Sequence, residues 1–502
     1  MPPTLLISID TEEEFDWSAP MSPRQRAVTH VRHLSRLHEV FEETGTRPTY
    51  LLDHPIATSD QGIDVLRGLH RRGNCEIGAH LHPWVNPPVV EEICPRHSFL
   101  HNLPRALQRE KRRLHTLDYP YSLGTFYESV TSALGFRPGR HEGKIVGLAA
   151  YSDPEVLGDV LRSLFVWDDA GFQMLRSSDL FLARRLAALF PKIDVAAAYQ
   201  RVLEEVAVRY VRPYVERLKL DTLVLSGGVF ANVKLNQRLY EIPGVRRITI
   251  HPNMGDGGCG TGAALLQFVQ NGKRPEVPAD VYWGPDYDEA QIEAALRSAG
   301  VAYARVPDIE VEIARLIADD KVVARFDGRM EYGPRALGNR SILYQAQNPE
   351  VNQWLNARLL RTEFMPFAPA TLYEDRHLCY QNIEGAEFAA RFMTITFDCT
   401  PWMREHCPAA VHVDGTARPQ LVSADTNPSF HSVLSEYKKR TGIPSVINTS
   451  FNMHEEPIIC SPADAIRSFQ DGRLDYLALG NFLVRSPELV DNAAAARQTA
   501  AV

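Results

Sequence analysis

The stretch GRMEYGPRALGNRS (residues 328–341) follows a β-branched, apolar run at residues 321–326 that predicts a strand. Arg329, Arg335 and Arg340 fall within twelve residues, between glycines and a proline. Glycine lets a backbone approach a ligand closely, and arginine makes forked contacts with phosphate or carboxylate. The interleaved apolar residues predict a packed loop, so we expect the three cations to have anionic partners. Ser341 would add a hydroxyl donor.

Three further segments carry similar chemistry in the C-terminal half. RTEFMPFAP (361–369) joins a charged pair to a rigid apolar loop, and HVDGTARPQ (412–420) places a histidine, an aspartate and an arginine around a glycine turn. NTSFN (448–452) follows a strand predicted at 445–447. For any one segment alone, a cap or a turn is the better interpretation. Four of them in one region favour a shared anion site.

Together these segments resemble, in sequence and order, the C-terminal domain of the NodU/CmcH-type O-carbamoyltransferases. The resemblance implies a YrdC-like domain that combines ATP with carbamate released from carbamoyl phosphate, giving carbamoyl-adenylate. It implies catalytic roles for Arg335, Arg340, Arg418 and Asp256. It also implies that carbamoyl-adenylate or ATP is bound by Arg329, Ser341, Arg361, His412, Asn448, Thr449, Ser450 and Asn452. The family has a lysine and a second arginine near residues 361–369, where this chain has Leu360 and Met365, and Arg361 is the candidate substitute.

The middle region contains two strand–glycine loop–helix patterns, at residues 221–232 and 246–262. Backbone N–H groups in such loops cradle phosphates. These segments resemble the second lobe of the family's actin/Hsp70-like ATPase fold. The resemblance implies a nucleotide loop at Gly227, Gly228, Asn232, Gly255 and Gly257, and a metal ligand at Asp256, which without it would read as an ordinary turn residue. In that family the first lobe carries a histidine pair that completes the metal site, and nothing before Tyr119 resembles that lobe.

The N-terminal segment has a different pattern, because strands and helices are predicted to alternate in β–α–β order over residues 4–79. Carboxylates stand at the end of its first strand, and His80 and His82 share one face of an extended segment. An aspartate with two histidines suits a divalent ion that activates water. The segment resembles the NodB-type polysaccharide deacetylases, with Asp10, Glu12, His80 and His82 as the implied ligands. The histidine spacing departs from that family and its later motifs are missing, so purely structural histidines remain an alternative.

Composition restricts the remaining classes of function. The 502 residues carry a formal net charge of -8, which argues against a nucleic-acid partner, because such binding needs a basic surface. Seven scattered cysteines without a CxxC pair predict neither a disulfide framework nor a zinc knuckle and fit a reducing, cytoplasmic compartment. No apolar run reaches the roughly 18–20 residues that span a bilayer, so no membrane association is expected.

The sequence therefore predicts an α/β protein in four parts. These are a partial deacetylase-like barrel (1–117), the second lobe of an actin/Hsp70-like domain (118–272), a YrdC-like domain (279–490) and a flexible tail (491–502). The expected activity is ATP-dependent transfer of a carbamoyl group to a hydroxyl of a sugar or natural product. ATP, carbamoyl phosphate and a divalent metal, Fe or Mg, are the expected cofactors, and a homo-oligomer is possible. A metal-dependent glycan deacetylase with an appended domain, and an inactive nucleotide-binding remnant, are the alternatives.

Overall fold

The computed structural model describes residues 7–11, 14, 27–79, 122–153, 155, 157–168, 171–174, 180–274, 278–362 and 364–487. The chain folds into two compact units. The first contains Met1–Phe126, Ser163–Asp179 and Gly260–Pro275, and the second contains Tyr127–Arg162, Leu180–Cys259 and Glu276–Val502. Each unit is treated separately below.

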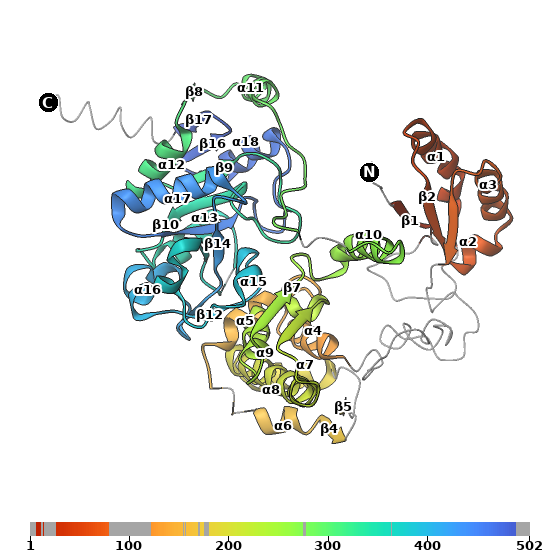
Figure 1. Cartoon of the computed structure of the whole chain (residues 1–502), viewed down its shortest axis with the longest axis horizontal. Helices are drawn as coiled ribbons and strands as arrows, with labels where there is room; N and C mark the ends of the chain where they lie inside the picture. The colour runs from red at the N-terminus through yellow and green to blue at the C-terminus, as the bar shows by residue number, and fades with distance from the viewer. Residues whose placement is uncertain are drawn as a thin grey trace. The chain divides into compact units, whose positions relative to one another are not determined.

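A three-stranded parallel sheet forms the N-terminal part of the first unit (Figure 1). The strands β1 (Ile7–Thr11), β2 (Pro48–Leu52) and β3 (Glu76–Ala79) lie in chain order. Helices α1 (Leu34–Glu43), α2 (His54–Thr58) and α3 (Asp60–Arg71) connect them, and Tyr50, Leu66 and Leu69 share their core. The predicted β–α–β rhythm is thus confirmed, and a 3₁₀ turn, η1 (Thr29–His33), precedes α1.

The remainder of the first unit consists of the hairpin of β4 (Phe165–Asp168) and β5 (Gly171–Met174) and most of helix α10 (Cys259–Gln270). Helix α4 (Leu123–Ala133) spans the boundary between the units in the chain.

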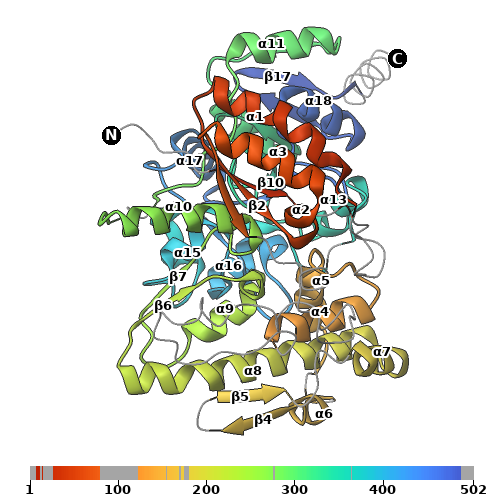
Figure 2. The same cartoon turned by 90° about the vertical axis from the view of Figure 1, so that its right-hand side faces the viewer.

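The second unit begins with a helical region that includes one pair of strands. The long helix α8 (Lys192–Leu218) runs beside α9 (Val233–Tyr240), as Figure 2 shows. Strands β6 (Thr222–Leu225) and β7 (Arg247–Ile250) pair in parallel, which confirms both predicted strands. Helices α5 (Glu142–Ala149) and α6 (Gly158–Arg162) pack on α8, and α7 (Leu180–Leu189) precedes it.

An eight-stranded mixed sheet organises the C-terminal part of the second unit, in the order β14-β11-β15-β10-β9-β16-β17-β8. Its strands are β8 (Tyr303–Arg305), β9 (Val323–Phe326), β10 (Arg340–Gln345), β11 (Ala368–Leu372), β14 (Gln420–Val422), β15 (Ser445–Ser450), β16 (Tyr476–Leu479) and β17 (Phe482–Arg485). A separate short pair joins β12 (Phe397–Asp398) to β13 (Thr416–Ala417).

Helices α12 (Ile309–Ala318) and α17 (Pro428–Thr441) pack against each other and on this sheet, while α18 (Pro462–Asp471) contacts α11 (Glu289–Ser298) and strands β9 and β16. The shorter helices are α13 (Val351–Arg358), α14 (Arg376–Cys379), α15 (Glu387–Arg391) and α16 (Pro401–His406).

Strand register brings two of the sequence motifs together at the centre of the sheet. Strand β10 lies between β15 and β9, and Ser341 stands opposite Ser450 on one side and Arg325 on the other. The prediction that the Asn448 segment follows its strand is wrong, because β15 continues through Ser450. The ladder to β10 and β11 holds this polar stretch in extended form.

In the part of the chain that the structure describes, no helix combines the length and apolar character required to cross a bilayer.

Helix α3 contains two glycines in opposite settings, which gives a test of its packing. A Cβ at Gly62 would lie 2.1 Å from the Ile56 carbonyl oxygen, whereas a Cβ at Gly68 would meet nothing within 4 Å. We expect Gly62→Ala to loosen α3, and Gly68→Ala to stabilise it by about 1 kcal/mol through helix propensity. Hydrogen–deuterium exchange of α3 peptides in the full-length protein measures both effects. Equal protection of α3 in the two variants would contradict this packing.

Candidate active site

The arginine-rich loop at residues 327–340 is held by a carboxylate at its centre. Glu331 is buried, and its Oε1 accepts hydrogen bonds from the backbone N–H groups of Leu337 at 2.7 Å, Asn339 at 2.8 Å and Arg340 at 3.2 Å. A carboxylate that accepts several backbone N–H bonds is stabilised in its charged form. The loop therefore folds around Glu331, which confirms that it is packed.

Arg340 binds the same loop from the other side. Its side chain is fully buried, and its two Nη atoms donate to the carbonyl oxygens of Asp327, Gly328, Asn339 and Pro285 at 3.0–3.3 Å. Its guanidinium carbon lies 3.6 Å from the centre of the Phe326 ring. Burial lowers the pKa of Arg340, and Glu331 opposes that effect. Both Nη atoms are engaged by main-chain oxygens, so this placement makes Arg340 a residue that shapes the loop.

Ser341 and Arg325 complete the internal bracing of the loop. The Gly338 N–H donates to Ser341 Oγ at 2.9 Å, so the hydroxyl predicted as a ligand donor acts here as a buried acceptor. Arg325 donates through Nη1 to the Gly338 carbonyl at 2.6 Å and through Nη2 to Asp327 and Ser429, each at 2.7 Å. Gly338 has φ of 109°, and a Cβ there would lie 2.3 Å from the Phe430 ring, so only glycine fits.

The other two arginines of the motif are less enclosed. Arg329 is exposed and donates to the carbonyl oxygens of Trp283 at 2.9 Å and Gly284 at 3.2 Å. Arg335 is half-buried in the same loop. Of the three arginines, Arg329 and Arg335 are thus the two with exposed surface from which a ligand can be reached.

Arg361 ties the RTEFMPFAP segment to the polar end of β15. Its Nη1 donates to Thr449 Oγ1 at 2.9 Å, and its Nη2 donates to the Ser450 carbonyl at 2.7 Å and to the Asn452 carbonyl and side-chain oxygens at 2.6 and 2.8 Å. One guanidinium thus fixes three of the predicted binding residues. Two segments that are far apart in the sequence meet here, as the sequence predicts.

The third segment joins through a buried amide pair. Asn448 Nδ2 donates to Gln420 Oε1 at 2.7 Å and to the Ala336 carbonyl at 3.2 Å, while Gln420 Nε2 donates to the Leu337 carbonyl at 2.7 Å. These bonds connect the end of HVDGTARPQ, the NTSFN segment and the arginine-rich loop. All four motifs therefore belong to one hydrogen-bonded assembly.

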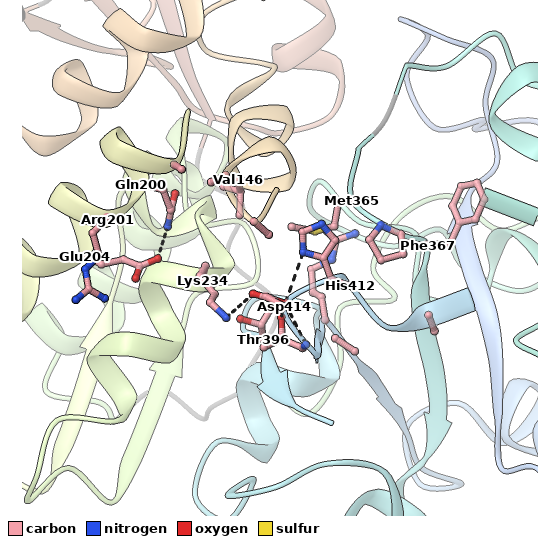
Figure 3. Close-up of a pocket in the computed structure, with 18 residues that line it drawn as sticks. Val146, Gln200, Arg201, Glu204, Lys234, Met365, Phe367, Thr396, His412 and Asp414 are labelled. Carbon is pink, nitrogen blue, oxygen red and sulfur yellow. Dashed lines mark hydrogen bonds and ion pairs between the residues drawn. The ribbon is translucent and has the colours of Figure 1, made fainter. Parts of the chain in front are cut away.

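A cavity of about 160 Å³ lies in the second unit beside this assembly (Figure 3). The RTEFMPFAP and HVDGTARPQ segments contribute Met365, Phe367, His412, Asp414 and Arg418 to its wall. Helices α5, α8 and α9 contribute Val146, Ala149, Gln200, Arg201, Glu204 and Lys234. Arg418 is therefore the member of the predicted catalytic set that reaches this cavity.

Asp414 is the most constrained charge in the cavity wall. Lys234 Nζ lies 2.7 Å from its Oδ2, while the hydroxyl and backbone N–H of Thr416 donate to its Oδ1 at 2.7 and 3.1 Å. His412 Nδ1 lies 3.6 Å from the same Oδ1. Burial raises the pKa of Asp414, but the contacts with His412, Lys234 and Thr416 outweigh burial and hold it well below its usual range. The carboxylate therefore stays charged at neutral pH.

A buried polar chain forms the opposite wall of the cavity on α8. The hydroxyl of Tyr127 donates to Gln200 Oε1 at 2.5 Å, and Gln200 exchanges hydrogen bonds with Asn232 and donates to Glu204 at 2.7 Å. Burial raises the pKa of Glu204. Asn232 also caps α9 by accepting from the Leu235 N–H at 3.0 Å, so the predicted nucleotide-loop residue has a structural partner here.

The predicted glycine loops follow β6 and β7 as expected. Gly227 has φ of 125°, and its N–H donates to the Met254 carbonyl at 2.7 Å, which joins the two loops. Gly228, Gly255 and Asp256 lie on or near the surface in short turns beside Gly257. Tyr332 donates through its hydroxyl to the Gly257 carbonyl at 2.9 Å, so the second loop contacts the arginine-rich motif.

A metal centre is not assembled by the side chains that the structure describes. Among them, no three His, Cys, Asp or Glu residues gather as potential ligands, so Asp256 belongs to no such group. The described residues on their own thus do not fit the metal that the resemblance implies. Of the deacetylase-like set, Glu12, His80 and His82 lie outside the described residues, and only the backbone of Asp10 is described, in β1.

Several residues of this site are not predicted from the sequence. Glu331, Arg325, Lys234, Gln200 and Glu204 were not predicted. Glu331 lies inside the quoted motif, six to nine residues before the N–H groups that it accepts from. A carboxylate this close in sequence to a glycine-containing loop is a candidate acceptor for the N–H groups of that loop. The cavity residues of α8 and α9 are polar positions on helices, which sequence alone assigns to solvent.

Two family matches cover the sequence motifs that form this site. A family described as the carbamoyltransferase C-terminus matches residues 314–486, and one described as the carbamoyltransferase N-terminus matches residues 98–265. The second match begins upstream of the domain boundary predicted near residue 117. The two matches cover the four motifs and all the residues that line the cavity.

Relatives extend the similarity over most of the chain. Nodulation protein NolO of Bradyrhizobium diazoefficiens is 35% identical over 383 residues, which are 72% of this chain and 69% of NolO. Nodulation protein NolNO of Sinorhizobium fredii is 34% identical over 76% of this chain and 58% of its own length. An uncharacterised protein of Methanocaldococcus jannaschii is 35% identical over 72% of this chain and 62% of its own length.

The family matches and these relatives identify the class of protein. The chain belongs to the carbamoyltransferase family. It spans 62% of the archaeal relative and 58% of NolNO, so these relatives also contain sequence outside the matched region.

The contrast between two arginines tests the structural role of the loop contacts. We expect Arg340→Leu to lower the free energy of unfolding by about 3 kcal/mol or more, because four carbonyl groups lose their donor and the buried Glu331 loses its cation. Arg329→Leu removes an exposed side chain and should cost less than about 1 kcal/mol. Denaturant unfolding of the full-length protein measures both. Similar losses in the two variants would show that Arg340 does not brace the loop.

Proposed function

We propose that this protein forms carbamoyl-adenylate from ATP and carbamoyl phosphate and transfers its carbamoyl group to a hydroxyl of a sugar or natural product. The observation that supports it is the convergence of four motifs on one braced assembly that presents Arg329, Arg335, Arg361 and Arg418. Family membership supports carbamoyl transfer, and the assembly supplies a means of binding phosphate.

In this proposal a carbamate oxygen attacks the α-phosphorus of ATP, the new O–P bond forms, and pyrophosphate leaves. Arg335 and Arg418 neutralise the charge that accumulates on the phosphates and the carbamate. Fixed cations placed where charge develops commonly contribute most to such catalysis. Because Glu331, Arg325 and Arg340 brace the backbone, these cations need little reorganisation when the substrates bind.

Arg361 has a positioning role in the same proposal. Its bonds to Thr449, Ser450 and Asn452 fix the polar edge of β15, which would then hold the adenylate through the remaining hydroxyl and amide groups. Arginine offers a planar fork for these several acceptors, and lysine does not. The predicted substitution of Arg361 for the family's usual cations is consistent with this arrangement.

The test is pyrophosphate release from ATP by the full-length protein, with and without carbamoyl phosphate. We expect release to depend on carbamoyl phosphate and to fall about 100-fold or more in Arg335→Ala, since loss of one charge-stabilising donor costs roughly that much. Arg297→Ala is the matched control, because its side chain is 69% exposed on α11 and bonds Glu293 and Tyr303, neither of which belongs to the four motifs or lines the cavity.

Each outcome bears on the proposal. Release that Arg297→Ala retains and Arg335→Ala loses supports adenylate formation at the assembly. A folded wild-type protein that releases no pyrophosphate with both substrates present refutes it and favours the nucleotide-binding remnant.

A further inference from the structure

One buried nitrogen in the cavity wall has no role in the assembly above. His412 is 8% exposed, and its Nε2 has no hydrogen-bond partner among the described residues. A buried polar atom without a partner costs free energy, and in native proteins such atoms often mark a ligand or catalytic position. The ring lies in the wall of the cavity and makes an edge contact with Tyr151, at 5.7 Å between centres.

The other ring nitrogen faces an anion that is firmly held. Asp414 lies 3.6 Å from His412 Nδ1 and is fixed by Lys234 and Thr416 (Figure 3). A carboxylate in this position stabilises the imidazolium that forms when Nε2 takes up a proton. Geometry and charge thus equip His412 to act as a base toward a molecule in the cavity.

The size and charge of the cavity suit a compact anion. It has about 160 Å³, and an apolar cavity of about 150 Å³ holds benzene, so there is room for a molecule of that size. Lys234, Arg201 and Arg418 line it and would attract a phosphate. Carbamoyl phosphate is only slightly larger than benzene, carries a phosphate, and is the small co-substrate of the proposed function.

We propose that this cavity binds carbamoyl phosphate and that His412 is the general base for its hydrolysis to carbamate. His412 Nε2 accepts a proton from a water molecule, whose oxygen attacks the carbonyl carbon. The new C–O bond forms, the C–O bond to the phosphate breaks, and inorganic phosphate leaves. The carbamate then reacts with ATP at the neighbouring arginines, with Arg418 common to both places. This inference rests on the proposed function.

Charged groups face His412 from every neighbouring element. Asp414 is its direct partner, and the cavity wall also contains Lys234 on α9, Arg201 and Glu204 on α8, and Arg418 after β13, with Tyr151 against the ring. Asp414→Asn removes the anion that faces the ring when Nε2 accepts the proton of water. In this variant the rate of phosphate release from carbamoyl phosphate should therefore fall.

The decisive experiment compares two sources of carbamate in His412→Asn, using the full-length protein. With carbamoyl phosphate and ATP we expect pyrophosphate release to fall about 100-fold or more, which is the usual contribution of general base catalysis. With ATP and ammonium carbamate, which bypasses hydrolysis, release should remain within about threefold of wild type. His406→Asn is the matched control, because His406 stacks on Trp402 in α16 and is not among the cavity-lining residues.

The outcomes separate this inference from the function on which it rests. Equal loss with both carbamate sources, in a folded variant, would assign His412 to binding the adenylate and overturn the hydrolytic role. Unchanged release from carbamoyl phosphate in His412→Asn, or an unchanged rate of phosphate release in Asp414→Asn, would also overturn it. If wild type releases no pyrophosphate from either source, adenylate formation fails. Phosphate release from carbamoyl phosphate alone, lost in His412→Asn, would still support the base.

Discussion

The carboxylate of Glu331 is the interaction on which the assembly depends. Three backbone N–H groups converge on one of its oxygens, and they belong to the residues that carry the chain from the loop into β10. Without that acceptor the loop would present unpaired donors in a buried setting, next to the cation of Arg340. Glu331 thus satisfies the backbone and balances the charge of the arginine that braces it from the other side.

This arrangement divides the arginines into two physical kinds. Arg325 and Arg340 are almost fully enclosed and spend their hydrogen bonds on protein oxygens. Arg329, Arg335 and Arg418 keep part of their surface outside the packed interior. Arg361 is also partly exposed, but its guanidinium donates to β15 and the residues after it and has a positioning role. A rigid inner set holds the loop, and an outer set with some exposure is suited to bind anions. Rigidity matters because a preorganised site loses less free energy when the ligand binds.

The sequence predicted correctly those features whose residues are contiguous in the chain, such as short strands and motifs. Strands β2, β6 and β7 follow from short runs of apolar and β-branched residues, and the four C-terminal motifs do converge. It failed where burial decides the role of a side chain. Arg340 and Ser341 resemble ligand groups in the sequence. In the structure, however, both lie at the start of β10, between β9 and β15, and both are fully buried. The cavity was unpredictable because its walls come from helices and loops remote in sequence.

The ion pair of Lys234 and Asp414 connects the helical wall of the cavity to one of the four motifs of the assembly. Lys234 lies on α9, and Asp414 lies in the turn before β13, so this ion pair joins the helical region to the C-terminal sheet region within the second unit. Both side chains are partly buried, where an ion pair is screened less than on an open surface. Breaking it would expose His412 to a different charge environment. The contact that closes one wall of the cavity therefore also sets the chemistry of the imidazole beside it.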